Sequence, residues 1–82
     1  MKIEILGAGC KKCDLLYDNT LKALDLAGLR EEAHVEKVKD IDQILKMGVY
    51  TTPALVVDGD VLSTGRVLSP EQILDKLRPK GP

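Results

Sequence analysis

One short segment near the start of the chain constrains the fold more than any other. Residues 2–6 contain two β-branched isoleucines and end at Gly7, which is typical of a strand. Both cysteines of the chain, Cys10 and Cys13, follow in a glycine-containing loop, and helical periodicity begins there. The segment therefore predicts a strand and a tight loop that place a dithiol at the N-terminus of a helix.

The pattern after the dithiol predicts a helix and then an edge strand. Helical periodicity continues from about Cys10 to Ala27, and Gly28 is a favourable terminator. The apolar stripe of this predicted helix consists of Cys13, Leu16, Tyr17, Thr20, Leu21, Leu24 and Ala27. Residues 33–38 follow with the weak, mixed pattern of an edge strand.

The second half of the chain predicts four more elements. They are a short helix that ends at Gly48, strands over 54–57 and 61–65 joined by a turn at 58–60, and a last helix that begins at Ser69. Asp40 and Gln43 have the spacing of a capping box before the short helix. Ser69 followed by Pro70 is a strong start for the last helix.

These elements predict an α/β fold in the order β-α-β-α-β-β-α. The first two strands are joined through a helix, so we expect them to be parallel with a right-handed crossover. The last two form an antiparallel hairpin, which makes a four-stranded mixed sheet flanked by three helices. With 82 residues, the chain is expected to form one domain over 1–78 and a flexible tail at 79–82.

Composition limits the classes of function. The net charge of −1 favours neither a nucleic-acid partner nor an anionic membrane. No apolar run approaches the roughly 20 residues that span a bilayer, and the expected strand at the N-terminus indicates no signal peptide. We therefore expect a cytoplasmic protein. In that reducing compartment, a close cysteine pair favours redox chemistry or metal binding over a structural disulfide.

The setting of the dithiol predicts a reactive first cysteine. The positive end of the helix dipole and unpaired N–H groups of the first turn would stabilise a thiolate at Cys10. Lys11 and Lys12 add positive charge beside it. We expect these groups to lower the pKa of Cys10 from about 8.5 to about 7 or below. Cys10 would attack a disulfide, and the more buried Cys13 would resolve the mixed disulfide.

A second motif lies directly before the strand at 54–57. A proline there, Pro53, removes a donor from the strand ladder, so a cis Thr52–Pro53 bond would be a specific feature. Together with the glycine–cysteine segment at 7–13, the segment 49–59 resembles the thioredoxin/glutaredoxin superfamily. More narrowly, the chain resembles small thioredoxin-like redox proteins of archaea and bacteria, and the likeness covers nearly its whole length.

The resemblance implies a thioredoxin-like fold and a thiol–disulfide oxidoreductase that exchanges its dithiol with protein disulfides. It implies that Thr52 presents its backbone to the substrate and that Pro53 packs against the dithiol. No cofactor or metal is implied, and electrons would come from a reductase or a thiol. We expect a monomer that docks client proteins transiently. Typical thioredoxins have Gly-Pro between their cysteines, whereas this chain has Lys11 and Lys12.

Three further residues have two interpretations each. Glu4 stands where thioredoxins place a buried acid and would accept a proton from Cys13, but a solvent-side or strand-end carboxylate is the simpler interpretation. Tyr50 would flank the dithiol as a lid or be an ordinary half-buried tyrosine. His34 is interpreted as a surface histidine on the edge strand.

The alternative function is a carrier of Cu(I) or another soft metal, held by Cys10 and Cys13. Heavy-metal-associated domains also place two cysteines after the first strand, but they usually have a methionine where this chain has Ala8. Their order of elements after the first helix also differs. Nucleotide binding is disfavoured because Cys13 replaces the third glycine of the fingerprint. A closed zinc or iron–sulfur site would require a dimer.

Overall fold

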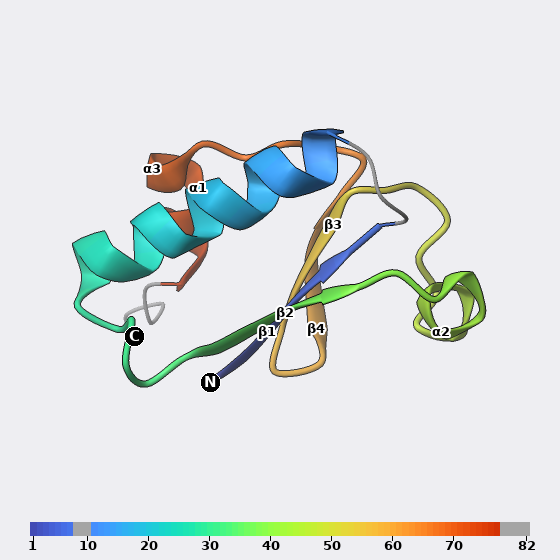
Figure 1. Ribbon diagram of the computed structural model, residues 1–82, viewed down its shortest axis with the longest axis horizontal. Coiled ribbons are helices and arrows are strands. Elements are labelled where there is room, and N and C mark those ends of the chain that lie inside the picture. Colours follow the sequence, from blue (N-terminus) through green and yellow to red (C-terminus); the bar gives the residue numbers. More distant parts are fainter. Residues whose placement is uncertain (8–10, 78–82) are drawn as a thin grey trace.

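The computed structural model describes residues 1–7 and 11–77 and contains one four-stranded sheet with three helices (Figure 1). The elements are β1 (Lys2–Leu6), α1 (Lys11–Ala27), β2 (His34–Val38), α2 (Ile41–Lys46), β3 (Ala54–Val57), β4 (Asp60–Thr64) and α3 (Pro70–Leu77). This order confirms the predicted α/β class and the β-α-β-α-β-β-α succession. The predicted tail at 79–82 and the helix start at Cys10 lie outside the described residues.

The sheet has the order β2-β1-β3-β4, so β1 lies inside it and β2 at an edge, as predicted. β1 is parallel to β2 and antiparallel to β3, and β3 and β4 form the antiparallel hairpin. The parallel pairing continues beyond β1, because the N–H of Gly7 donates to the carbonyl of Val38 at 2.9 Å. The end of β1, where the dithiol segment begins, is therefore held by its neighbour.

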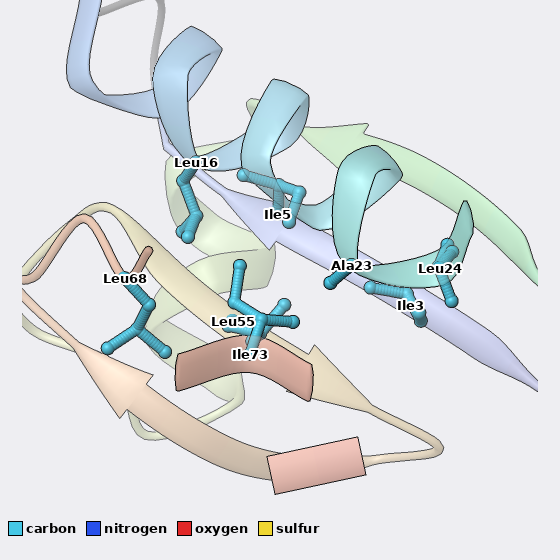
Figure 2. Close-up of a cluster of buried hydrophobic side chains, with 8 residues drawn as sticks. All are labelled: Ile3, Ile5, Leu16, Ala23, Leu24, Leu55, Leu68 and Ile73. Carbon is cyan, nitrogen blue, oxygen red and sulfur yellow. The ribbon is translucent and has the colours of Figure 1, made fainter. Parts of the chain in front are cut away.

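α1 and α3 pack on one face of the sheet (Figure 1). The buried members of their shared core are all aliphatic, as expected from a sequence without Phe or Trp. Figure 2 shows its buried members, which are Ile3, Ile5, Leu16, Ala23, Leu24, Leu55, Leu68 and Ile73. Thr20 is buried in α1, and its hydroxyl donates to the carbonyl of Leu16 at 2.7 Å, so this polar group is satisfied.

α2 covers part of the opposite face. The second core cluster consists of Leu6, Val38, Ile44, Val49, Ala54 and Val56. Ile44 is the buried residue of this six-residue helix, whereas Ile41 and Leu45 are 60% and 46% exposed. The short helix thus closes the second core and also presents apolar side chains to solvent.

The helix caps and the hairpin follow their local sequences with two differences. A reciprocal capping box forms at α3, where the Ser69 N–H donates to Gln72 Oε1 and the Gln72 N–H donates to Ser69 Oγ. At α2, Asp40 Oδ1 accepts from the N–H of Asp42, and no return bond from Gln43 forms among the described residues. β4 begins at Asp60 because the turn uses only two residues, which both have positive φ.

No helix within residues 1–7 and 11–77 has the length and apolar character that a bilayer-spanning segment requires.

Candidate active site

The site is built where β1 ends against the first turn of α1. Cys13 lies in that turn and is 4% exposed. Gly7 follows β1 and faces the cysteine so closely that a Cβ atom on Gly7 would overlap Cys13 Sγ. The same Cβ would lie 3.3 Å from Cys13 Cβ and 3.7 Å from Thr52 Cβ. The missing side chain of Gly7 therefore makes the space that the Cys13 sulfur occupies.

The loop before β3 forms the second half of the site. The Thr52–Pro53 peptide bond is cis, Pro53 is buried and Thr52 is exposed. The Pro53 carbonyl accepts a hydrogen bond from the N–H of Gly65 at 2.9 Å, which ties this loop to the segment after β4. A Cβ on Gly65 would lie 3.3 Å from Thr51 Oγ1. The first turn of α1 and the loop before β3, which are far apart in sequence, thus both approach Gly7.

The charges at the N-terminus of α1 are exposed. Lys11 and Lys12 open the helix, and Asp14 is the acidic residue of its first turn. Lys37 Nζ on β2 lies 2.8 Å from Asp14 Oδ1 and 4.8 Å from the centre of the Tyr17 ring. The hydrogen bond and the charge of Lys37 lower the pKa of Asp14, and the hydrogen bond to Asp14 raises the pKa of Lys37. Asp14, the residue after Cys13, therefore forms an ion pair with Lys37 on the edge strand β2.

We expect this pair to stabilise the fold only while both groups are charged. The pKa of Asp14 is depressed, so its contribution is present above the ordinary value of 3.8 and is lost as the pH falls through the folded value. The pKa of Lys37 is raised, so its contribution is present below 10.5 and is lost as the pH rises through the folded value. A double-mutant cycle with Asp14→Asn and Lys37→Gln should give a small coupling energy near neutral pH and none at about pH 2. A coupling that persists in acid would contradict an ionic contact.

Glu4 lies neither on the solvent side nor at the end of its strand, where the simpler interpretation placed it. It lies in the middle of β1 and is 7% exposed, so a solvent-side or strand-end carboxylate is wrong. Ile3 and Ile5 face α1, and side chains alternate along a strand, so Glu4 lies on the opposite face of the sheet. Its neighbours in register are Glu36 and Val56. β1 thus separates Glu4 from the α1 face, and its role as a proton acceptor stays a prediction.

Tyr50 is 81% exposed, so the interpretation as a half-buried tyrosine is also wrong. It borders an apolar groove of about 200 Å³ between α2 and the loop before β3. The residues that line this groove are Ile41, Ile44, Leu45, Val49, Tyr50 and Thr52.

His34 is exposed on β2, as expected, and its Nε2 lies 3.2 Å from Glu36 Oε2.

Sequence reasoning missed the contributions of two glycines and of α2. Gly7 was interpreted only as the end of a strand, and Gly65 only as the end of another. The positive φ of Gly65, +69°, turns the chain back towards Pro53. One signal for the role of α2 was available. Its six residues include three large apolar side chains, Ile41, Ile44 and Leu45, and so short a helix buries only Ile44.

Cys10 lies outside the described residues, so the dithiol is described through Cys13 alone. Within 1–7 and 11–77, no three His, Cys, Asp or Glu side chains gather closely enough to hold a metal ion.

Comparisons with known proteins agree with this arrangement. A thioredoxin of Methanothermobacter thermautotrophicus is 44% identical over 73 residues, which cover 89% of this chain and 92% of that protein. A thioredoxin of Methanocaldococcus jannaschii is 34% identical over 76 residues, which cover 93% and 85%. The family model described as thioredoxin domain matches residues 1–78. The resemblance seen in the two motifs is thereby confirmed, and the chain belongs to the thioredoxin family.

Proposed function

We propose that this member of the thioredoxin family, a family of thiol–disulfide oxidoreductases, reduces disulfides of client proteins with Cys10 and Cys13. The observation that carries the proposal is the contact at Gly7. Gly7 lies against the Cys13 sulfur on one side and near Thr52 on the other. Cys13 is in the first turn of α1, and the second cysteine of the motif, Cys10, stands three positions before it in the sequence. The buried Cys13 side chain, which shares Gly7 as a neighbour with the loop that carries Pro53, suits the resolving half of a dithiol.

The reaction has two steps that balance. The Cys10 thiolate attacks one sulfur of the client disulfide, forms a mixed disulfide and releases the other client sulfur as a thiolate, which takes a proton from water. Cys13 then loses its proton and attacks Cys10 Sγ as a thiolate, and the second client sulfur leaves as a thiolate that takes up a proton. The client gains two electrons and two protons, and the protein is left with a Cys10–Cys13 disulfide. An external dithiol reductase or a low-molecular-weight thiol restores the dithiol.

Local electrostatics support the first step. The exposed ammonium groups of Lys11 and Lys12 stand at the positive end of the α1 dipole. The negative charge of Asp14 would offset these positive charges, but Asp14 Oδ1 is paired with Lys37 Nζ at 2.8 Å. This distribution favours a thiolate at Cys10. We further propose that the protein works as a monomer in the cytoplasm and needs neither a cofactor nor a metal.

The test compares wild type with Cys10→Ser and Cys13→Ser in an insulin-type disulfide reduction assay. Wild type should turn over with a dithiol donor, Cys10→Ser should be inactive because its hydroxyl is not ionised, and Cys13→Ser should accumulate a mixed disulfide that mass spectrometry detects. Cu(I) affinity is measured in parallel. Tight Cu(I) binding by a wild type that shows no exchange would overturn the proposal in favour of a metal carrier.

A further inference from the structure

The first turn of α1 carries more positive than negative charge. Lys11 and Lys12 open this turn, both are exposed, and neither forms an ion pair with another described residue. Asp14, in the same turn, is paired with Lys37 at 2.8 Å. The hydrogen bond and the charge of Lys37 are the main causes that lower the pKa of Asp14, and the charge of Lys39 lowers it further. Lys39 therefore lies within electrostatic reach of the first turn.

Lys39 and Arg66 bring positive charge to the same end of the sheet from two other segments. Lys39 follows Val38, whose carbonyl accepts a hydrogen bond from the N–H of Gly7 beside the site. Arg66 follows Gly65, whose N–H donates to the loop before β3. Both cations are exposed, and neither is in an ion pair within the described part of the chain. Lys11, Lys12, Lys39 and Arg66 are called the cationic rim below.

Carboxylates at this end are fewer than cations. Asp42 begins α2 and Lys46 ends it, so the charges of this helix offset each other, and Asp40 is its N-cap. The exposed cations at this end are Lys11, Lys12, Lys37, Lys39, Lys46 and Arg66, and the exposed carboxylates are Asp14, Asp18, Asp40 and Asp42. The end of the sheet that holds the exchange site is therefore positively charged.

The opposite end of the sheet is acidic. The loop before β2 and the turn between β3 and β4 lie there together, because the N–H groups of His34 and Asp58 donate to the carbonyls of the first two residues (Figure 1). Beside the terminal amine, the cations that the described residues place there are Lys2 and Arg30, and both are paired with carboxylates. The exposed acidic side chains of these two segments are Glu31, Glu32, Asp58 and Asp60. The net charge of −1 thus conceals a separation of charge along the sheet.

Such a separation of charge orients a charged partner before contact. An acidic partner is attracted to the end that holds the exchange site and repelled from the opposite end. Complementary fields of this kind raise association rates by about 10- to 1,000-fold, and salt weakens them. The charge of a partner should therefore affect the rate at which it reaches the dithiol.

We propose that the cationic rim binds acidic segments of client proteins, so that disulfides flanked by aspartate or glutamate are reduced faster than disulfides flanked by lysine or arginine. This inference rests on the proposed exchange function and deepens it, because it names the charge of the preferred substrate. An acidic peptide is favoured over a nucleic acid as the occupant. The rim flanks the redox motif, so a long polyanion bound there would block the dithiol.

The experiment uses three capped serine-based peptides, each with one cysteine joined by a disulfide to 2-thiopyridine, a neutral leaving group. One peptide has two aspartates on each side of the cysteine, one has two lysines there, and one has serines. Stopped-flow absorbance with reduced protein in excess gives the second-order rate constant of thiopyridine release. The rim variant is Lys39→Glu with Arg66→Glu, which leaves the redox motif unchanged. The control is Lys22→Glu with Lys76→Glu, the same change of charge at exposed positions of α1 and α3.

Wild type should reduce the aspartate peptide about tenfold faster than the lysine peptide at low salt. The ratio should approach one in about 1 M salt, where the Debye length falls to about 3 Å. The rim variant should bring the low-salt ratio close to one, and the control should keep most of it. The serine peptide shows whether each variant remains active. A low-salt ratio of one or below for wild type, or an equal loss of the ratio in both variants, would overturn the inference.

Two other outcomes have distinct meanings. If single-stranded DNA slows reduction of the serine peptide by wild type and not by the rim variant, the rim binds nucleic acid and the inference is wrong. If wild type releases thiopyridine from none of the three peptides, the proposed exchange function itself fails. A wild type that reduces all three peptides at similar rates contradicts only the preference for acidic clients.

Discussion

Replacing Gly7 with alanine is expected to slow disulfide exchange and to destabilise the fold by about 1–3 kcal/mol. The added methyl group would overlap Cys13 Sγ and lie 3.3 Å from Cys13 Cβ. Gly7 cannot retreat easily, because its N–H is bonded to the carbonyl of Val38. The Cys13 side chain must therefore rotate away, which moves the resolving sulfur. Mixed disulfide with the client should accumulate, and mass spectrometry of quenched reactions measures it.

A double-mutant cycle separates this clash from a general effect of the substitution. Cys13→Ala removes the sulfur that the new methyl group would meet, so Gly7→Ala should cost less stability in that background. Chemical denaturation of the four proteins measures the difference. Gly28→Ala is the matched control, because a Cβ there meets nothing within 4 Å although φ is +69°. It should lower stability without trapping mixed disulfide. An equal cost of Gly7→Ala in both backgrounds would show that the sulfur is not the obstacle.

Replacing Ile73 with alanine is expected to destabilise the protein by about 2–5 kcal/mol. Ile73 is fully buried, and it is the buried residue of α3 in the core shared with α1 (Figure 2). A domain of this length has a total stability of about 4–12 kcal/mol, so the loss is a large fraction of it. Leu74 and Leu77 of α3 pack against the same core but are only partly buried, so they cannot replace that contact. The side-chain amide of Asn19 also donates a hydrogen bond to the Leu68 carbonyl at 2.9 Å, which ties α1 to the segment before α3.

Urea denaturation followed by circular dichroism measures this loss. The midpoint for Ile73→Ala should fall, and the slope should stay near that of wild type if unfolding remains a single transition. Leu26→Ala is the control, since its side chain is 63% exposed and should change stability by less than about 0.5 kcal/mol. A loss below about 1 kcal/mol for Ile73→Ala would contradict the close packing of α3 on the sheet.

Much of the fold could be predicted because local patterns specify it. The isoleucines of β1 and the stripe of α1 pack on one another as expected, and Ser69 caps α3. The edge position of β2 was readable from its weak pattern. Each of these features depends on periodicity or capping within a few residues, which the sequence displays directly.

The candidate site was predictable in its parts and not in its contacts. The cysteine motif and Pro53 stand out in the sequence, and the family match extends over nearly the whole chain. The burial of Glu4 could not be read, because it depends on β1 having a strand on each side. The exposure of Tyr50 could not be read either, because it depends on how α2 packs against the core cluster around Ile44 and Val49.

The sequence by itself determined the order of the elements, the chemical identity of the dithiol and the family. Only the tertiary structure decided that Gly7 faces Cys13, that Thr52 lies near Gly7, and that α2 and the loop with Thr52 leave an apolar groove between them. The physical reason is that helices and strands follow from neighbouring residues, whereas the approach of Gly7 to Thr52 joins residues 45 positions apart. Their distances are set by the pairing of β1 with β3 and by the packing of α1 on the sheet.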